Sequence, residues 1–252
     1  NQDYKPTYLR MIQNQMTALF NHAEKFYDLK DNPCKKVDKM GRPNAKELNF
    51  WTKDEYEQFI KCFSPDEEMY RIIFQMLFWL GCRVGELLAL ISEDIDFEKR
   101  TMYIRRSVVK LAQQEPEIKL PKTISSIRQI AIPQALCDIL QELKKEQDRK
   151  KALLGEKWHE EGFLFTDWCG HVMHPHTPTK QFDKFLKKYG FRHLKFHGLR
   201  HSSATYLLSN GGDIKTVSKR LGHTSIDTTN IYVHALEKTD KAAAECFDSI
   251  EV

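Results

Sequence analysis

The sequence predicts an α+β fold that is mainly helical, with one small antiparallel sheet of three strands. Apolar residues recur at helical spacing near both ends of the chain, before residue 91 and again after Pro133. Between these regions the spacing shortens to that of strands, around a turn at residues 98–100 and over residues 126–132. Strands and helices do not alternate, which excludes the βαβ arrangement of nucleotide-binding folds.

The first predicted element is an amphipathic helix over residues 6–29, where apolar residues such as Leu9, Ile12 and Met16 share one face. It should end before Asn32-Pro33, because proline disfavours helical geometry at the residue before it. Residues 35–49 are polar, basic and interrupted by glycine and proline, which is typical of a linker. We therefore predict a partial domain at 1–34, a linker at 35–49 and a second domain at 50–252.

The second domain opens on Thr52-Lys-Asp-Glu55, which has the form of a capping box and predicts a helix start. Further helices are predicted at about 66–80 and from Gly85, and a hairpin over 94–109. A third strand is predicted over 126–132, stopped by Pro133. The remaining predicted helices, separated by glycines, are at about 134–153, 177–189, 198–209, 213–221 and 225–247.

Composition places the chain among soluble globular proteins. Of its 252 residues, 41% are hydrophobic and 29% are charged. The most apolar stretch, residues 72–90, contains Gln75, Arg83 and Glu86, so we interpret it as core rather than a membrane span. The start carries no signal sequence and no Met, which suggests a fragment of a longer protein. The six cysteines form no CxxC pair, which favours a reduced cytoplasmic protein over a disulfide framework.

The net charge of +4 conceals an uneven distribution. Residues 176–223 hold ten Lys or Arg against two Asp, so this segment carries +8 and the rest of the chain −4. A concentrated basic region indicates a phosphate-bearing partner. A solvated helix face is the alternative interpretation, and the motifs near these residues decide between the two.

Four segments carry residues suited to phosphoryl chemistry. They are Gly81-Cys-Arg-Val-Gly-Glu86, Pro121-Lys122 with the residues up to Arg128, His197-Gly-Leu-Arg-His201, and Leu221-Gly-His223 followed by Tyr232. His197 and Arg200 are three residues apart, so they share one face of a helix. A guanidinium group can donate two parallel hydrogen bonds to two oxygens of a phosphoryl group. Tyr232 lies about two turns into a predicted helix, with its hydroxyl available as a nucleophile.

These blocks, in this order, resemble the catalytic domain of the tyrosine recombinases, especially the lambda-integrase-like integrases of phages and conjugative transposons. The resemblance covers roughly Phe50 to Leu236, and its most specific block is Leu221–His234. It implies the tyrosine recombinase catalytic fold for residues 50–252. It also implies that residues 1–34 are the end of a core-binding domain, and that the C-terminal tail docks on a neighbouring protomer or in cis.

The resemblance implies roles for six catalytic residues. Arg83 and Arg200 would clamp the scissile phosphate, Lys122 would protonate the departing 5′ oxygen, and His197 would act in proton transfer. His223 would hydrogen-bond the phosphate, and Tyr232 would attack phosphorus to give a 3′-phosphotyrosine. Glu86 and His201 are expected to support these residues. Contacts to DNA are expected from Arg128, Lys180, Lys184, Lys195, Lys215, Lys219 and Arg220.

The chemistry of the residues is consistent with these roles. A free tyrosine has a pKa near 10, so only about 0.1% is phenolate at pH 7, and activation needs a nearby acceptor or a positive field. The covalent link conserves the bond energy, so no ATP is needed, and the chain has no GxxxxGK[ST] motif. We expect no cofactor and no metal, since the histidines around Cys169–His176 match no common zinc spacing.

The implied function is site-specific recombination that integrates or excises a mobile element. Expected partners are double-stranded DNA attachment sites, three further copies in a tetramer, and an excisionase or a host DNA-bending protein, with no membrane. The expected location is the bacterial cytoplasm, at the nucleoid. Two alternatives stay open: a type IB topoisomerase-like strand transferase, and a non-catalytic DNA-binding module of the same fold.

Overall fold

The computed structural model describes residues 4–40, 48–110, 115–120 and 126–245, with side chains up to residue 237. The chain divides into two compact units, residues 1–47 and 48–252. The predicted general acid, Lys122, and the tail beyond residue 245 lie outside the described residues. The predicted domain and linker boundaries stay predictions.

The first unit is built on helix α1 (Pro6–Phe26), which begins with proline at a position where its missing N–H costs nothing. The helix ends before Asp28, whose φ of 53° is left-handed, so it is shorter than the predicted 6–29. The chain then folds back through the short helix η1 (Pro33–Lys35). The buried Gln13 side chain donates to the Asp38 carbonyl over 2.9 Å and accepts from the Met40 N–H over 2.5 Å, so part of the predicted linker is tied to α1.

The core of the second unit is aromatic and forms around helix α3 (Glu68–Leu80). Helix α2 (Lys53–Lys61) begins with the predicted capping box: Thr52 Oγ1 accepts from the Glu55 N–H over 3.2 Å, and Glu55 Oε2 accepts from the Thr52 N–H over 2.9 Å. Phe59 of α2, Phe74 of α3 and Phe182 of helix α6 (His176–Tyr189) meet in edge-to-face contacts. The buried residues of α3 run from Ile72 to Phe78 and include Leu80, so most of this helix is enclosed by the core.

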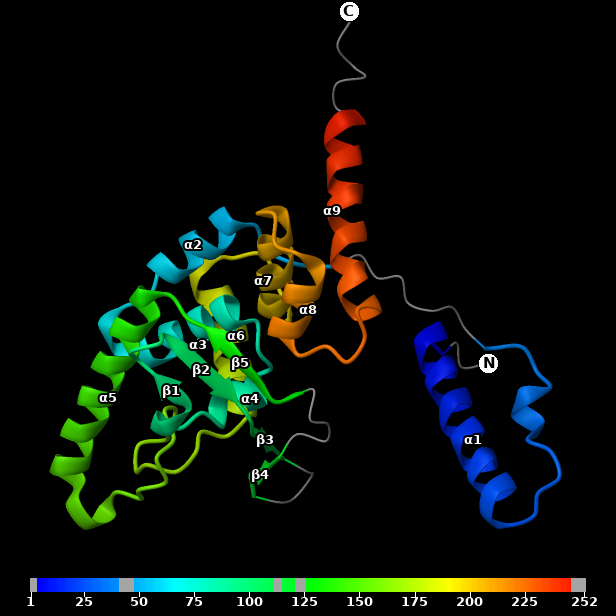
Figure 1. The fold of residues 1–252 in the computed structure, drawn as a ribbon, viewed down its shortest axis with the longest axis horizontal. Helices are drawn as coiled ribbons and strands as arrows, with labels where there is room; N and C mark the ends of the chain where they lie inside the picture. The colour runs from blue at the N-terminus through cyan, green and yellow to red at the C-terminus, as the bar shows by residue number, and fades with distance from the viewer. Residues whose placement is uncertain (1–3, 41–47, 111–114, 121–125, 246–252) are drawn as a thin grey trace, which may run out of the picture. The chain divides into compact units, whose positions relative to one another are not determined.

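The sheet has the predicted three antiparallel strands, in the order β1 (Ile95–Asp96), β2 (Thr101–Ile104) and β5 (Arg128–Ala131) (Figure 1). Met102 pairs with Ile95 on one side and with Ile130 on the other, and its side chain is fully buried. The predicted hairpin over 94–109 is too long. Strand β3 (Ser107–Val109) leaves this sheet and pairs with β4 (Glu117–Lys119) in a separate ribbon.

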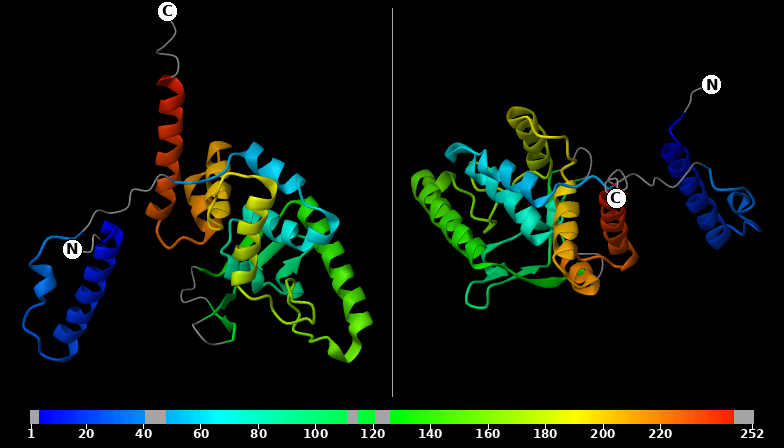
Figure 2. Two further views of the ribbon diagram at one scale, coloured as in Figure 1. Left: turned by 180° about the vertical axis from the view of Figure 1, so that it is seen from behind. Right: turned by 90° about the horizontal axis from the view of Figure 1, so that it is seen from above.

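The remaining helices follow the predicted positions closely. They are α4 (Val84–Leu88), α5 (Gln134–Leu154), α7 (Gly198–Ser209), α8 (Ile214–Leu221) and α9 (Asp227–Glu245). Three one-turn helices lie between the longer elements: η2 (Pro65–Glu67), η3 (Ser92–Asp94) and η5 (Gly155–Lys157). Helix α7 packs against α3 on one side and against α9 on the other, as Figures 1 and 2 show. The mainly helical α+β class is therefore confirmed.

Candidate active site

Arg83 is positioned by the abrupt end of α3. Gly81 ends that helix with φ +61°, and a Cβ there would lie 2.6 Å from Leu221 Cδ2, so only glycine fits without strain. The chain then turns so that Arg83 is the N-cap residue of α4. Its side chain is 48% exposed, and its Nη1 donates to Glu86 Oε1 over 2.9 Å. The guanidinium thus has one anchored edge and one solvent-facing part.

Glu86 holds two arginines at once. Its Oε2 accepts from Arg128 Nη2 over 2.8 Å in the interior, and from the Arg83 backbone N–H over 3.0 Å. Burial favours the neutral carboxyl, but the hydrogen bond and charge of Arg128, with those of Arg83, bring the pKa of Glu86 below its ordinary value. Glu86 is therefore an anion whose two oxygens bind Arg83, and its role in supporting the site stays a prediction.

Arg128 corrects a sequence prediction. It was expected to contact DNA, but it is 5% exposed, and its guanidinium also donates to the carbonyls of Arg220, over 2.7 Å, and Ser126, over 3.2 Å. All three side-chain nitrogens are engaged inside the protein, so Arg128 joins β5 to α4 and α8. No surface remains on it for a phosphate.

Arg220 is half-buried and anchored within the protein. Its Nη1 donates to the Ala131 carbonyl over 3.0 Å and its Nη2 to the Trp79 carbonyl over 2.9 Å. Two guanidinium nitrogens therefore tie α8 to β5 and to the end of α3, and the predicted contact of Arg220 to DNA stays a prediction. The other predicted DNA contacts are exposed lysines, and their role stays a prediction: Lys180, Lys184, Lys195, Lys215 and Lys219.

Arg200 is buried where three helices end or begin. It is 3% exposed, and its Nη1 donates to the carbonyls of Gly81 and Leu221, each over 2.7 Å. Burial and the nearby charge of Arg83 lower the pKa of Arg200 to about 10. The guanidinium is still charged at neutral pH, so a cation stands fixed between α3, α7 and α8.

Tyr232 reaches this cation from α9. Its side chain is 1% exposed and packs with Ala204, Val217 and Leu221. Its Oη lies 2.9 Å from His201 Nδ1, and its ring is nearly parallel to that of His223, at 11° and 6.3 Å between centroids. Burial raises the pKa of Tyr232, although the charges of Arg200 and Arg83 act in the opposite direction.

Two histidines beside Tyr232, His201 and His223, are neutral at pH 7. Burial, followed by the nearby charges, lowers the pKa of His201 and of His223 to about 4, and burial and Arg200 also lower that of His197. His223 Nδ1 lies 2.8 Å from Thr229 Oγ1. Neutral imidazoles can each accept one hydrogen bond and donate another, so they add no charge to the cations already present.

All the predicted catalytic residues that the structure describes lie together. With His201 they form what we name the Arg–His–Tyr cluster: Arg83, His197, Arg200, His201, His223 and Tyr232. His201 was expected only to support the site, yet it is the residue whose ring nitrogen meets the tyrosine hydroxyl. Its spacing on α7 gave no sign of this, because Tyr232 comes from a different helix.

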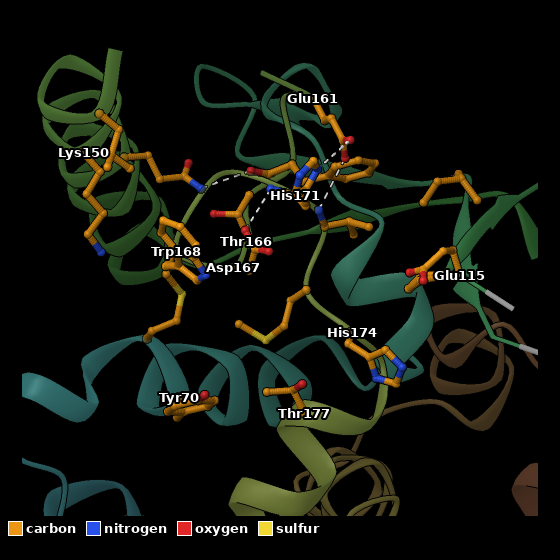
Figure 3. Close-up of a pocket in the computed structure, with 18 of the residues that line it drawn as sticks. Tyr70, Glu115, Lys150, Glu161, Thr166, Asp167, Trp168, His171, His174 and Thr177 are labelled. Carbon is orange, nitrogen blue, oxygen red and sulfur yellow. Dashed lines mark hydrogen bonds and ion pairs between the residues drawn. The ribbon is translucent and has the colours of Figure 1, made fainter. Parts of the chain in front are cut away.

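Of two cavities in the second unit, one borders the cluster. One of about 320 Å³ is bordered by His197 and Arg200 of the cluster and by Cys82 and Val84 beside Arg83. A larger one, of about 1210 Å³, contains no cluster residue and lies between α5, the start of α3 and the segment from Glu161 to Thr177 (Figure 3). The smaller cavity is therefore the one relevant to the cluster's chemistry.

The histidine-rich segment Cys169–His176 lines the larger cavity through His171 and His174. His171 Nδ1 faces Glu161 over 3.4 Å, and His174 lies farther along the wall (Figure 3). Within the described residues, no three His, Cys, Asp or Glu side chains are grouped to hold a metal ion. Among the helices that the structure describes, none is both long enough and apolar enough to cross a membrane.

Comparison with known proteins shows to which family the chain belongs. The pattern of the phage integrase family matches residues 49–239, which include every residue of the Arg–His–Tyr cluster. The chain belongs to the phage integrase family. It is 33% identical to a XerC-like tyrosine recombinase of Caldanaerobacter subterraneus over 96% of its own length and 66% of that protein's. It is 29% identical to the ICEBs1 integrase of Bacillus subtilis, again over 96% of this chain and 66% of the relative.

Solved structures give the same fold. The Tn1549 transposon integrase in complex with a circular intermediate DNA matches 92% of this family member and 76% of that chain, with a TM-score of 0.77 at 20% identity. The XerA recombinase matches with a TM-score of 0.60 at 21% identity. The tyrosine recombinase catalytic fold expected from the sequence is therefore confirmed. The chain spans about two thirds of the length of the curated relatives it matches.

Proposed function

We propose that this integrase-family protein is a site-specific DNA recombinase that cleaves and rejoins strands through a 3′-phosphotyrosyl intermediate on Tyr232, and so integrates or excises a mobile element. The observation that carries the proposal is the Arg–His–Tyr cluster itself. A tyrosine hydroxyl hydrogen-bonded to a neutral imidazole stands in the field of two arginines, Arg83 and Arg200. This is the donor and nucleophile set that a phosphodiester transesterification requires.

In the proposed reaction the arginines bind the non-bridging oxygens of the scissile phosphate. Arg83 supplies a partly exposed fork whose orientation Glu86 fixes, and Arg200 supplies a charge held by the Gly81 and Leu221 carbonyls. Such preorganised donors stabilise the charge that develops on phosphorus without reorganising at the moment of reaction. His223 would add a hydrogen bond, and His197 would take part in proton transfer.

DNA binding must open a path to the nucleophile. Tyr232 is 1% exposed, so a phosphodiester cannot meet its Oη until the side chains or the helix around it shift. The contacts that bury the ring come from α7 and α8, through Ala204, Val217 and Leu221. A small displacement of α9 relative to these helices would therefore accompany substrate binding.

Lys122 completes the proposal as the general acid for the departing 5′ oxygen. It precedes the start of β5 by only a few residues, and β5 begins at Arg128, which is bonded to Glu86. The proposal predicts that Lys122→Ala slows cleavage of an ordinary phosphodiester but not of a 5′-bridging phosphorothiolate, whose leaving group needs no proton. Equal slowing on both substrates would reject this role for Lys122.

The proposed partner is double-stranded DNA carrying the element's attachment sites. Exposed lysines on α6 and α8 support this, as does the DNA bound by the Tn1549 integrase and lambda integrase structures that share the fold. We further propose a tetramer on two sites, docking of the C-terminal tail on a neighbouring protomer, an excisionase or DNA-bending accessory protein, and a location at the bacterial nucleoid. Residues 1–34 would be the end of a core-binding domain, followed by a linker at 35–49.

A covalent adduct tests the function directly. The substrate is a nicked DNA duplex that contains the joined ends of the mobile element carrying the gene of this protein. The protein is incubated with this duplex without divalent metal, and the products are separated on a denaturing gel. A protein–DNA adduct should form with the wild-type chain and with the control Tyr103→Phe, which removes a half-exposed hydroxyl on β2. Tyr232→Phe should form none, and a persisting adduct would reject Tyr232 as the nucleophile.

Three further measurements on the same protein separate the alternatives. Recombinant joints between two attachment duplexes would support the recombinase. Relaxation of supercoiled plasmid without joints would indicate a topoisomerase-like enzyme. Tight binding without any adduct would indicate a DNA-binding module.

A further inference from the structure

The hydrogen bond between His201 and Tyr232 points to a role that the family resemblance did not assign. The resemblance implies proton transfer by His197, yet the ring nitrogen 2.9 Å from Tyr232 Oη is His201 Nδ1. His197 stands one helical turn earlier, with its ring edge-on to that of His201 and 5.0 Å away between centroids. The two rings are therefore in contact, and among the described residues it is His201 that hydrogen-bonds to the Tyr232 hydroxyl.

Resting on the function proposed above, we propose that His201 is the proton acceptor for the nucleophile. As Tyr232 Oη forms its bond to phosphorus, its proton passes to His201 Nδ1, and the bond between phosphorus and the 5′ oxygen breaks. The leaving 5′ oxygen takes a proton from the general acid. In the rejoining step the 5′ hydroxyl attacks phosphorus and returns its proton to the general acid, the Oη–phosphorus bond breaks, and His201 returns its proton to Oη.

The surroundings of His201 suit an acceptor. The titratable and charged groups facing it are His197 and Arg200 from its own part of the chain, Tyr232 from α9, and His223 from the turn before α9. Burial first, and then the neighbouring His197 and the charge of Arg200, keep the imidazole neutral, with a pKa of about 4, so that in the tautomer protonated on Nε2 a lone pair is available on Nδ1 at physiological pH. Because burial also raises the pKa of Tyr232, the proton must leave as the bond to phosphorus forms and not before.

Substrate binding would strengthen this acceptor. A phosphodiester held by Arg83 and Arg200 brings negative charge beside the imidazole, which favours its protonated form. Arg200, whose charge acts with burial to hold His201 neutral in the free protein, is one of the two arginines that the phosphate would neutralise. The acceptor therefore gains basicity when the substrate is in place.

The test compares two substitutions at one position. His201→Asn keeps an oxygen that can accept the Tyr232 hydrogen bond near the place of Nδ1 but cannot take the proton, and His201→Ala removes both. Single-turnover formation of the covalent adduct on the nicked attachment duplex is measured from pH 6 to 8. We expect both variants to be slower by about 10²-fold or more at pH 7, the usual contribution of a positioned general base.

The pH profile distinguishes proton acceptance from positioning. Without the acceptor, the reaction depends on hydroxide or on prior ionisation of the phenol, so the ratio of wild-type to His201→Asn rates should fall about tenfold per pH unit. Groups that both proteins share, such as Lys122, affect the two rates equally, so their effect on the pH dependence cancels in this ratio. The control is His234→Asn, which changes an exposed histidine on the same helix as Tyr232 and should leave the rate and its profile unchanged.

Three results would overturn the assignment. They are a His201→Asn rate within twofold of wild type, a rate ratio independent of pH, and faster cleavage by either variant, which would mean that His201 only restrains the tyrosine. Thermal unfolding of each variant is measured alongside, and the Asn variant serves alone if the Ala variant does not fold. A wild-type chain that forms no adduct would overturn the proposed function itself, an outcome distinct from these three.

Discussion

Arg128 and Glu86 form a buried ion pair, 2.8 Å from Nη2 to Oε2, that joins strand β5 to helix α4. The two side chains are 2% and 7% exposed, and they stand 42 residues apart in the chain. Because the other Glu86 oxygen holds Arg83, the pair links the sheet to the Arg–His–Tyr cluster. It is therefore a structural determinant of where the first cluster arginine points.

Removing the arginine of this pair should destabilise the fold. Arg128→Ala leaves Glu86 a buried anion with only Arg83 to compensate it, and breaking a buried pair from one side typically costs about 3–5 kcal/mol. Urea unfolding monitored by circular dichroism gives the free energy of unfolding. The matched control is Lys145→Ala, which breaks an exposed pair with Glu142 and should change stability by less than about 1 kcal/mol. A similar small effect for both variants would contradict the role given to Arg128.

Substitution of Arg83 should affect chemistry far more than folding. Its side chain is 48% exposed, so Arg83→Ala removes little packing, whereas the loss of one charge-stabilising donor typically lowers a rate by about 10²–10³. Adduct formation and thermal unfolding are measured on the same preparation. A variant that cleaves at the wild-type rate would remove Arg83 from the phosphate-binding set.

Gly81 should not tolerate alanine. At φ +61° a side chain costs about 1–2 kcal/mol of backbone strain, and here the new Cβ would also meet Leu221 Cδ2 at 2.6 Å. Since the Gly81 carbonyl holds Arg200, adduct formation should fall as well. Gly190→Ala is the control, because its φ is +70° but nothing lies within 4 Å of the added Cβ. Equal losses of stability in the two variants would show that the close approach to Leu221 is unimportant.

Stability should fall as the pH is lowered from 7 to 5. His201 and His223 have folded-state pKa values of about 4 against an ordinary 6.5, so below pH 6.5 the unfolded chain binds protons that the folded chain does not. The contribution of each histidine is complete above about pH 6.5 and is lost as the pH falls toward 4. Glu86, whose pKa is depressed below 4.5, adds its own loss only at still lower pH.

Urea unfolding at pH 5 and pH 7 measures this slope. His201→Asn should reduce the slope, because asparagine does not titrate. His234→Asn, with an exposed ring, should leave it unchanged. An equal slope in the wild-type chain and in His201→Asn would show that the His201 ring is protonated in the folded protein.

Much of the fold could be predicted because its signals are local. The capping box at Thr52, the glycine that ends α3 and the change of apolar spacing near residue 94 each act within a few residues. The errors fall where distant contacts decide. Strand β3 leaves the sheet because it pairs with β4, and α1 ends early where Asp28 turns back toward contacts with Gln13.

The sequence by itself determined the family, the fold class and the residue types of the site, since these follow from short motifs and from apolar periodicity. Only the tertiary structure decided which residues touch. It buried Arg128 against Glu86, tied the half-buried Arg220 to the Trp79 carbonyl, and set His201 instead of His197 on the Tyr232 hydroxyl. The physical reason is that an arginine or a histidine has the same local pattern in both settings. Burial and hydrogen-bond partners, which assign its role, come from helices and strands far away in the chain.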